Sequence, residues 1–173
     1  MGRPRLAEVI VVDTSAIVAI AFGEPERESF IRAIDQAGKA LISTVSAVET
    51  RMVVHSRRGQ RAVVLVDDLL LLPLFELIPP GKPEMDAAYS AFVAFGRGSG
   101  HPANLNFGDV FSYALAKVRG LALLYKGNDF AQTDVMSACE LLSPADVLAE
   151  VRRLGVRTPA EATAQIRADR ERD

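Results

Sequence analysis

Val9-Ile10-Val11-Val12-Asp13-Thr14-Ser15 is an apolar run that ends at a carboxylate followed by two hydroxyls. A continuous β-branched run is typical of a strand that is buried on both faces of a parallel sheet. Thr14 and Ser15 open a segment rich in Ala, Ile and Val, which predicts a helix. Asp13 is therefore predicted at the carboxyl end of a core strand, where a charge loses hydration unless a partner or a ligand replaces it.

The same alternation of strands and helices continues along the chain to about residue 130. Further strands are predicted at residues 40–45, 75–78 and 121–125, with helices at 25–38, 46–59, 62–72, 83–95 and 109–119. Residues 96–108 form a loop rich in Gly and Asn, and connections of this length are usually functional or mobile. This order predicts an α/β fold, a three-layer sandwich with a mostly parallel central sheet flanked by helices.

The length and composition favour one main domain with short additions at both ends. With 173 residues, of which 49% are hydrophobic, the chain is long enough for one sizeable core. We expect an N-terminal extension at residues 1–8, the main domain at 9–142 and a charged helical appendage at 143–173, where Arg and acidic residues alternate.

Composition also limits the classes of function. The net charge of −2 provides no bulk basicity, so any contact with nucleic acid must come from a local patch or from bound metal ions. The single cysteine, Cys139, has no partner for an internal disulfide, which favours a reducing compartment. No apolar run is long enough for a membrane span, so a cytoplasmic protein with no membrane partner is predicted.

Four acidic residues occupy corresponding places at the ends of the predicted elements. Asp13 and Asp129 follow strands, whereas Glu49 and Asp109 lie in the first turns of helices. In a parallel sheet flanked by helices, all these places open on the carboxyl edge, where ligands bind. The topology therefore predicts that the four carboxylates lie on one side of the sheet.

Each acid alone has an explanation that needs no function. Ser46-Ala47-Val48-Glu49 matches a capping box, in which Glu49 would accept a bond from the Ser46 backbone N–H. Asp109 would favour the positive end of a helix dipole, and Asp129 would be a turn residue after Asn128. Only Asp13 gains nothing from such a local role.

Together, the four acids require compensation. If they lie within about 5 Å, each pair repels by about 3 kcal/mol at an effective dielectric constant of about 20, and the six pairs approach about 15–20 kcal/mol. Protonation or a bound cation must offset this repulsion, and all-oxygen ligands suit Mg²⁺ or Mn²⁺ better than zinc. A cation held in this way, with open water positions, is suited to phosphoryl chemistry.

Neighbouring residues fit the same chemistry, although each also has an ordinary structural role. Thr14 and Ser15 can bind a water or a phosphate oxygen beside Asp13, or they can cap the helix that they open. Arg51, Arg97 and Lys126 are candidate phosphate contacts, or solvated surface charges. Neither histidine has a partner that would make a rival metal site.

Beyond these patterns, four segments together resemble the PIN-domain ribonuclease toxins of the VapC type, in the order typical of that family. They are residues 9–16, Ser46–Glu49, residues 101–109 with Leu-Asn-Phe-Gly-Asp, and residues 123–134 with Lys-Gly-Asn-Asp-Phe. The last two blocks are specific, whereas Asp-Thr-Ser-Ala alone would be weak. The resemblance covers about residues 9–142.

This resemblance implies a PIN-like sandwich and a Mg²⁺- or Mn²⁺-dependent endoribonuclease that cuts RNA, commonly tRNA or ribosomal RNA. It implies a cognate VapB-type antitoxin that docks on the active-site face, and a homodimer. Carried over to this sequence, the catalytic and metal-binding acids are Asp13, Glu49, Asp109 and Asp129, with Thr14 or Ser15 assisting.

The chain also departs from that pattern, and other readings stay open. Asn128 stands where related sequences often have another acid, which weakens a second metal position, and the tail is longer than the family requires. One alternative is another Mg²⁺-dependent phosphohydrolase of the haloacid-dehalogenase type, but Ser15 occupies the place of its usual second Asp. The other is a PIN-like module that binds RNA or protein without catalysis.

Overall fold

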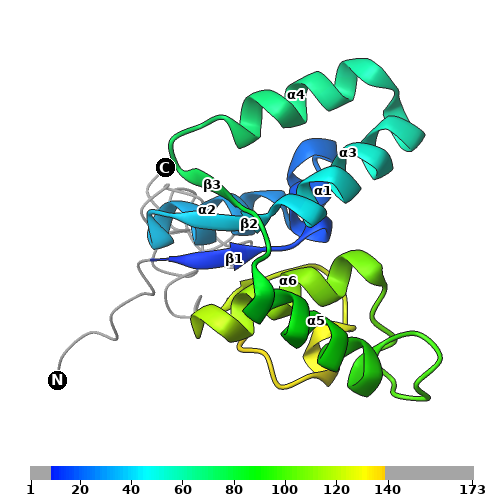
Figure 1. Cartoon of the computed structure of the whole chain (residues 1–173). Coiled ribbons are helices and arrows are strands. Elements are labelled where there is room, and N and C mark those ends of the chain that lie inside the picture. The colour runs from blue at the N-terminus through cyan, green and yellow to red at the C-terminus, as the bar shows by residue number, and fades with distance from the viewer. Residues whose placement is uncertain (1–8, 139–173) are drawn as a thin grey trace, which may run out of the picture. The chain divides into compact units, whose positions relative to one another are not determined.

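Four short parallel strands form the central sheet of the computed structural model, which describes residues 9–138 (Figure 1). The strands are β1 (Ile10–Val12), β2 (Ala40–Ser43), β3 (Phe75–Ile78) and β4 (Leu123–Leu124), in the order β3-β2-β1-β4. In the register, Val11 lies beside Leu41 on one side and beside Leu123 on the other. Strand β1 is therefore central, which explains why its sequence is apolar on both faces.

In the described part of the chain, six α-helices surround the sheet and confirm the α/β sandwich. Figure 1 shows α3 and α4 on one side of the sheet and α5 and α6 on the other. The helices are α1 (Thr14–Phe22), α2 (Arg27–Ala37), α3 (Thr44–Arg58), α4 (Gln60–Leu70), α5 (Lys82–Phe95) and α6 (Phe107–Arg119), followed by the short 3₁₀ helix η1 (Phe130–Gln132).

The core forms where the central strands meet α6. Val11, Leu105, Leu115 and Leu123 are at most 1% exposed, and all belong to one buried cluster. Strand β3 lies at the edge of the sheet and is only partly buried. The most deeply buried part of the fold therefore lies next to the carboxyl ends of β1 and β4.

Strand β2 ends two residues earlier than its apolar sequence predicts. The Ser43 hydroxyl accepts a bond of 3.2 Å from the backbone N–H of Val45 and caps α3, so Thr44 and Val45 are helical. Strand β4 is also shorter than predicted, because only Leu123 and Leu124 pair with β1. The early start of α3 matters for the site, because it places Ser46 inside the helix.

The long loop between α5 and α6 is anchored at both ends. The Leu105 N–H donates to the Phe95 carbonyl at 2.9 Å, and the Arg97 N–H donates to the Leu105 carbonyl at 3.0 Å. Ala103 and Leu105 are fully buried within this loop. The loop therefore holds Arg97 and Asn106 in fixed places beside the sheet edge.

Some of the sequence predictions fall outside the described residues. The N-terminal extension at 1–8, the charged appendage at 143–173 and the last residues of the predicted main domain all do. Within residues 9–138, no helix is long and apolar enough to cross a membrane.

Replacement of Ser43 tests the cap of α3. Ser43→Ala removes the acceptor of the Val45 N–H, so we expect the free energy of unfolding to fall by about 0.5–2 kcal/mol in a urea titration. Ser56→Ala, on an exposed position inside the same helix, should change it by less than about 0.5 kcal/mol. Equal stabilities of the two variants would contradict the assigned cap.

Candidate functional site

The Asp13 carboxylate is buried at the carboxyl end of β1, with only one of its oxygens bonded. Asp13 is 1% exposed, and its Oδ2 accepts bonds from the Ser15 N–H at 2.8 Å and from the Ser15 hydroxyl at 2.6 Å. Its Oδ1 is buried and has no hydrogen-bond partner among the described residues. Such an atom is rare in a folded protein and indicates a place for a ligand.

Glu49 is not part of the capping box that the sequence allows. Because α3 begins at Thr44, Ser46 lies inside the helix, and its hydroxyl is 2.9 Å from that of Ser112. The Glu49 Oε2 accepts a bond of 2.8 Å from the Thr14 hydroxyl instead. The capping-box alternative for Glu49 is therefore wrong, and its carboxylate is held by Thr14, at the start of α1.

The carboxylate of Glu49 also lies against the backbone of α6. A side-chain carbon added at Gly108 would overlap this carboxylate, so the glycine leaves the space that Glu49 occupies. Helices α3 and α6 thus approach closely at the point where Glu49 and Asp109 come together.

Asp109 is the acid that does form a capping box. Its Oδ2 accepts a bond of 2.7 Å from the Asn106 N–H, while the Asn106 Oδ1 accepts one of 2.9 Å from the Asp109 N–H. Burial, together with the charges of Asp13, Glu49 and Asp129, raises the pKa of Asp109 to about 7, although the hydrogen bond from the Asn106 backbone acts in the opposite direction. Asp109 can therefore cap α6 and, at the same time, belong to the group of acids at the site.

Glu49 shares this environment. Burial raises its pKa and the charge of Asp13 adds to the effect, while the Thr14 hydrogen bond and the charge of Arg97 lower it. Asp13, Glu49 and Asp109 line one cavity of about 400 Å³ together with Thr14, Ser15 and Asn106. The topology thus brings three of the four predicted acids into one space.

Asp129 lies at the margin of this group. It is exposed, it immediately precedes η1, and it does not line the cavity, although its charge acts on Asp109. The loop that carries it is attached to the site, since the Lys126 N–H donates to the Ser15 hydroxyl at 3.0 Å.

The predicted capping role of Thr14 or Ser15 is wrong, because Asp13, for which no local role was expected, provides the side-chain cap of α1. The hydroxyls of Thr14 and Ser15 orient the acids instead. The Thr14 hydroxyl lies 2.8 Å from Glu49 Oε2 and 3.1 Å from the Ser46 carbonyl. Thr50 and Ser46 are buried behind this contact, where the Thr50 hydroxyl donates to the Ser46 carbonyl at 2.8 Å. Neutral hydroxyls therefore separate α1 from α3 at the site.

The three basic side chains predicted to contact phosphate lie in different environments. The Arg51 guanidinium pairs with Asp67 at 2.6 Å, and the Lys126 ammonium pairs with Glu24 at 2.7 Å and with Glu26 at 2.8 Å. Arg97 is the one of the three whose charge lowers the pKa of a site acid.

Sequence reasoning missed three polar residues that line the cavity, Arg57, Asn106 and Glu24. Helical spacing from Glu49 through Val53 to Arg57 was the signal for the first. The Asn-x-x-Asp pattern before a helix was the signal for the second.

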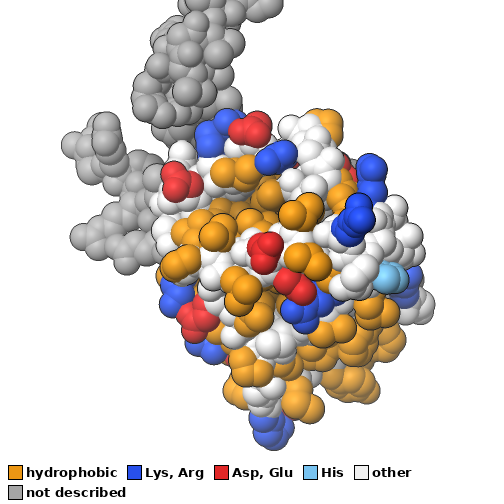
Figure 2. Space-filling view, turned by 90° about the horizontal axis from the view of Figure 1, so that it is seen from above, with side chains coloured by type: hydrophobic (Ala, Val, Ile, Leu, Met, Phe, Trp, Pro, Cys, Tyr) orange, Lys and Arg blue, Asp and Glu red, His pale blue; other side chains and the backbone are white. Residues whose placement is uncertain are grey.

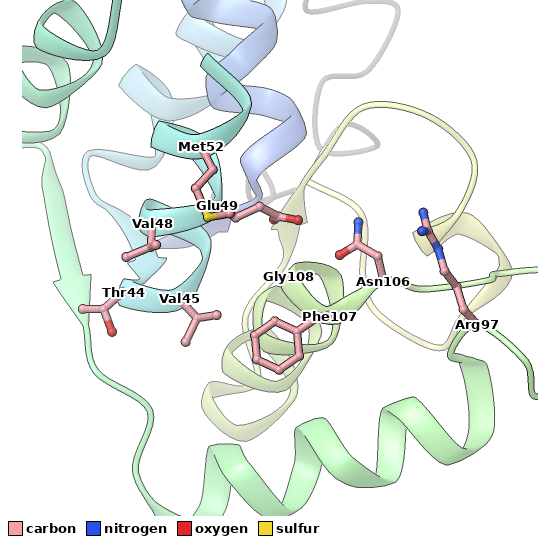
Figure 3. A pocket seen from close by; sticks show the side chains of 9 residues that line it. All are labelled: Thr44, Val45, Val48, Glu49, Met52, Arg97, Asn106, Phe107 and Gly108. Carbon is pink, nitrogen blue, oxygen red and sulfur yellow. The ribbon is translucent and has the colours of Figure 1, made fainter. Parts of the chain in front are cut away.

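Two apolar grooves adjoin the acidic cavity. One, of about 700 Å³, lies between α3 and the start of α6 and is lined by Val45, Val48, Met52 and Phe107 among others (Figure 3). The second, of about 550 Å³, lies between α5 and α6 and shares Arg97, Asn106 and Phe107 with the first.

Apolar side chains are also exposed on the side of α3 and α4. Figure 2 shows them gathered on this face around a few acidic and basic side chains. Val64 and Leu65 of α4 are 50% and 69% exposed. Patches of this kind mark surfaces that bind other macromolecules.

The donor set fits a hard divalent cation. Asp13, with its unpartnered Oδ1, lines the same cavity as Glu49 and Asp109, and carboxylate oxygens are the ligands that Mg²⁺ and Mn²⁺ prefer. Within residues 9–138, no three acidic, His or Cys side chains are already arranged to hold one ion. The acids therefore share a cavity without forming a complete coordination sphere.

Similarity to known proteins extends over most of the described residues. The PIN domain family model matches residues 10–136. The chain is 40% identical over 126 residues to the VapC ribonuclease Mb0640 of Mycobacterium bovis, which covers 73% of this chain and 95% of that protein. It is 40% identical over 131 residues to the ribonuclease VapC28 of Mycobacterium tuberculosis, which covers 76% and 98%.

Solved structures show the same fold at lower identity. VapC20 of Mycobacterium tuberculosis, a Sarcin-Ricin loop cleaving toxin, superposes with a TM-score of 0.62 at 21% identity, over 73% of this chain and 96% of that one. VapBC2 of Rickettsia felis, bound to a promoter DNA fragment, gives 0.60 at 12% identity, over 75% and 96%.

Gly108→Ala tests the contact between α6 and Glu49. Alanine normally stabilises a helix by about 1 kcal/mol relative to glycine, but the added carbon would overlap the Glu49 carboxylate. We therefore expect the opposite sign, a loss of about 1–3 kcal/mol in the free energy of unfolding. Val118→Ala, on the exposed side of α6, should change it by less than about 0.5 kcal/mol, and a stabilised Gly108→Ala protein would exclude the close contact.

The raised pKa of Asp109 predicts an unusual dependence of stability on pH. In the metal-free protein its contribution is fully present below about pH 4 and is lost as the pH rises through about 7, because the folded state holds the proton more tightly than the unfolded state. Asp109→Asn should reduce this decline and leave the part that comes from the raised pKa of Glu49, as measured by urea titrations across that range.

Asp68→Asn, at an exposed position on α4, is the matched control and should keep the wild-type profile. An unchanged profile in the Asp109→Asn protein would show that Asp109 does not hold the proton. Added Mg²⁺ should flatten the wild-type curve, since a cation favours the ionised carboxylate.

Proposed function

The chain belongs to the PIN domain family, and from this premise we propose that it is an endoribonuclease toxin that cuts RNA at the acidic cavity. One observation carries the assignment of the site. The buried Oδ1 of Asp13 has no partner, and it lines the same cavity as Glu49 and Asp109. A fold that leaves a carboxylate oxygen in this state requires a ligand to complete it.

The relatives support the reaction class. Curated proteins at about 40% identity are VapC ribonucleases, and the matches cover 95% or more of their length. The chain is accordingly a hydrolase that acts on phosphodiester bonds, as the toxin of a toxin–antitoxin pair. A non-catalytic PIN-like module would have no need of the unpartnered oxygen and the adjacent acids.

We assign Mg²⁺ or Mn²⁺ as the cofactor. Asp13, Glu49 and Asp109 would hold it, with Asp129 contributing from the edge of the site. When bound, the cation supplies an activated water and stabilises charge on the phosphate. Thr14 and Ser15 assist by fixing one oxygen each of Glu49 and Asp13, which leaves the Asp13 Oδ1 available.

The RNA backbone is held by positive charge at the rim of the cavity. Of the three predicted contacts, Arg97 acts on Glu49 through its charge and Lys126 lines the cavity, as does Arg57, which was not predicted. Arg51 and Lys126 already pair with carboxylates, so their contribution to RNA binding is weaker. Lys126 acts mainly by holding its loop against Glu24 and Glu26.

The expected protein partners are a VapB-type antitoxin and a second copy of the chain. The apolar groove between α3 and α6 adjoins the acids, and such a groove suits an amphipathic segment that would also cover the active site. The structural neighbours include a toxin–antitoxin complex from Klebsiella pneumoniae and VapBC2 of Rickettsia felis. The homodimer and the cytoplasmic location belong to the same proposal.

Asp13→Asn tests the function. The amide can still accept the bonds from Ser15, but it places a donor or a neutral oxygen where the free Oδ1 lies. We expect Mg²⁺-dependent cleavage of bulk tRNA or ribosomal RNA to fall by at least about 100-fold. The unfolding temperature should not fall, because a buried charge is removed.

Asp35→Asn, on an exposed position of α2, is the control and should cleave at the wild-type rate. Undiminished cleavage by Asp13→Asn would exclude this cavity as the active site. Loss of cleavage in both variants would mean that the substitutions act through something other than the site.

A further inference from the structure

We propose that the side-chain amide nitrogen of Asn106 donates a hydrogen bond to a phosphate oxygen of the bound RNA, while the oxygen of the same side chain caps α6. The inference rests on the proposed ribonuclease function and adds a substrate contact to it. Asn106 lines the acidic cavity and both apolar grooves beside it, so it stands where these spaces meet.

The hydrogen bonds fix which end of the amide is used. The Asn106 Oδ1 accepts the Asp109 N–H at 2.9 Å, and an amide nitrogen in that place would set two donors against each other. The backbone N–H of Asn106 is also used, since it donates to Asp109 Oδ2 at 2.7 Å. The Nδ2 group is what remains, and none of the residues that the structure describes accepts a bond from it.

The free nitrogen faces the space that RNA would enter. In Figure 3 it points away from α6, toward the region between the Glu49 carboxylate and the Arg97 guanidinium. These three residues line the same groove. The unpartnered Asp13 Oδ1, on a side chain that is 1% exposed, lies in the adjoining cavity and independently indicates a ligand there.

The chemistry of the site favours a neutral donor at this position. The acids repel a phosphodiester and offer it no hydrogen-bond donors, so the phosphate needs donors from neighbouring residues. A Lys or Arg this close to Asp109 and Glu49 would pair with them and compete with the cation. An amide provides the hydrogen bond without a charge, and the cap restricts its orientation.

A pure capping role makes a different prediction, and serine separates the two. Asn106→Ser keeps an oxygen that can accept the Asp109 N–H, since Ser and Asn are comparable N-caps, but it removes the amide nitrogen. Asn106→Ala removes both functions. The unfolding temperature reports the cap, and RNA cleavage and RNA affinity report the donor.

The experiment uses bulk tRNA and ribosomal RNA with saturating Mg²⁺, under single-turnover conditions. We expect Asn106→Ser to unfold close to the wild-type temperature and to cleave about 10- to 100-fold more slowly, the range for one lost hydrogen bond to a charged group. In the Asp13→Asn background, which blocks cleavage, Asn106→Ser should also weaken the affinity for fluorescently labelled tRNA. Asn106→Ala should show the same RNA defects together with a lower unfolding temperature.

Ser43→Ala is the matched control, because it removes a helix cap and Ser43 does not line the acidic cavity. It should unfold earlier and cleave at the wild-type rate per folded molecule. Wild-type cleavage and affinity in Asn106→Ser would overturn the proposal, as would RNA defects that track the fall in unfolding temperature across these variants. Cleavage that survives Asp13→Asn would instead exclude the acidic cavity as the active site of the proposed function, and tRNA affinity would then decide the role of Asn106.

Discussion

Repulsion among buried carboxylates is the constraint on which the rest of this site depends. The sheet places Asp13 at the end of its central strand, and α3 and α6 bring Glu49 and Asp109 into the same cavity. The raised pKa values of Glu49 and Asp109 record the free-energy cost of that arrangement. The surrounding residues accommodate the acids. The Thr14 hydroxyl and the Asn106 backbone N–H donate hydrogen bonds to Glu49 and Asp109, and a glycine on α6 leaves space for the Glu49 carboxylate.

The hydroxyl groups behind the acids explain how three helices meet without further charge. Thr14, Ser46, Thr50 and Ser112 are buried and lie within hydrogen-bond distance of one another or of the intervening backbone. Neutral groups of this kind satisfy buried polar atoms without adding to the negative field. A layer of neutral polar groups thus supports the acids from the side of the core.

Much of the fold was predictable because its signals are local. The β-branched run at residues 9–12 identified the central strand, and the parallel topology placed the acids at one edge. One error came from two equivalent signals, because Ser43 and Ser46 are both good N-caps and only the packed structure shows that Ser43 begins α3. Glu49 therefore forms no capping box, whereas Asp109 forms one with Asn106 at the start of α6. The pairings of Arg51 and Lys126 join residues distant in sequence, for which no local pattern exists.

The attachment of Lys126 to Glu24 and Glu26 gives ionic strength a second way to act on this protein. Dissolved salt weakens contacts between a protein and RNA phosphates, and it also screens exposed ion pairs within a protein. Here the screened pairs connect the turn between α1 and α2 to the loop that carries Asp129. High salt would therefore loosen one side of the acidic site in the free protein, before any RNA has been bound.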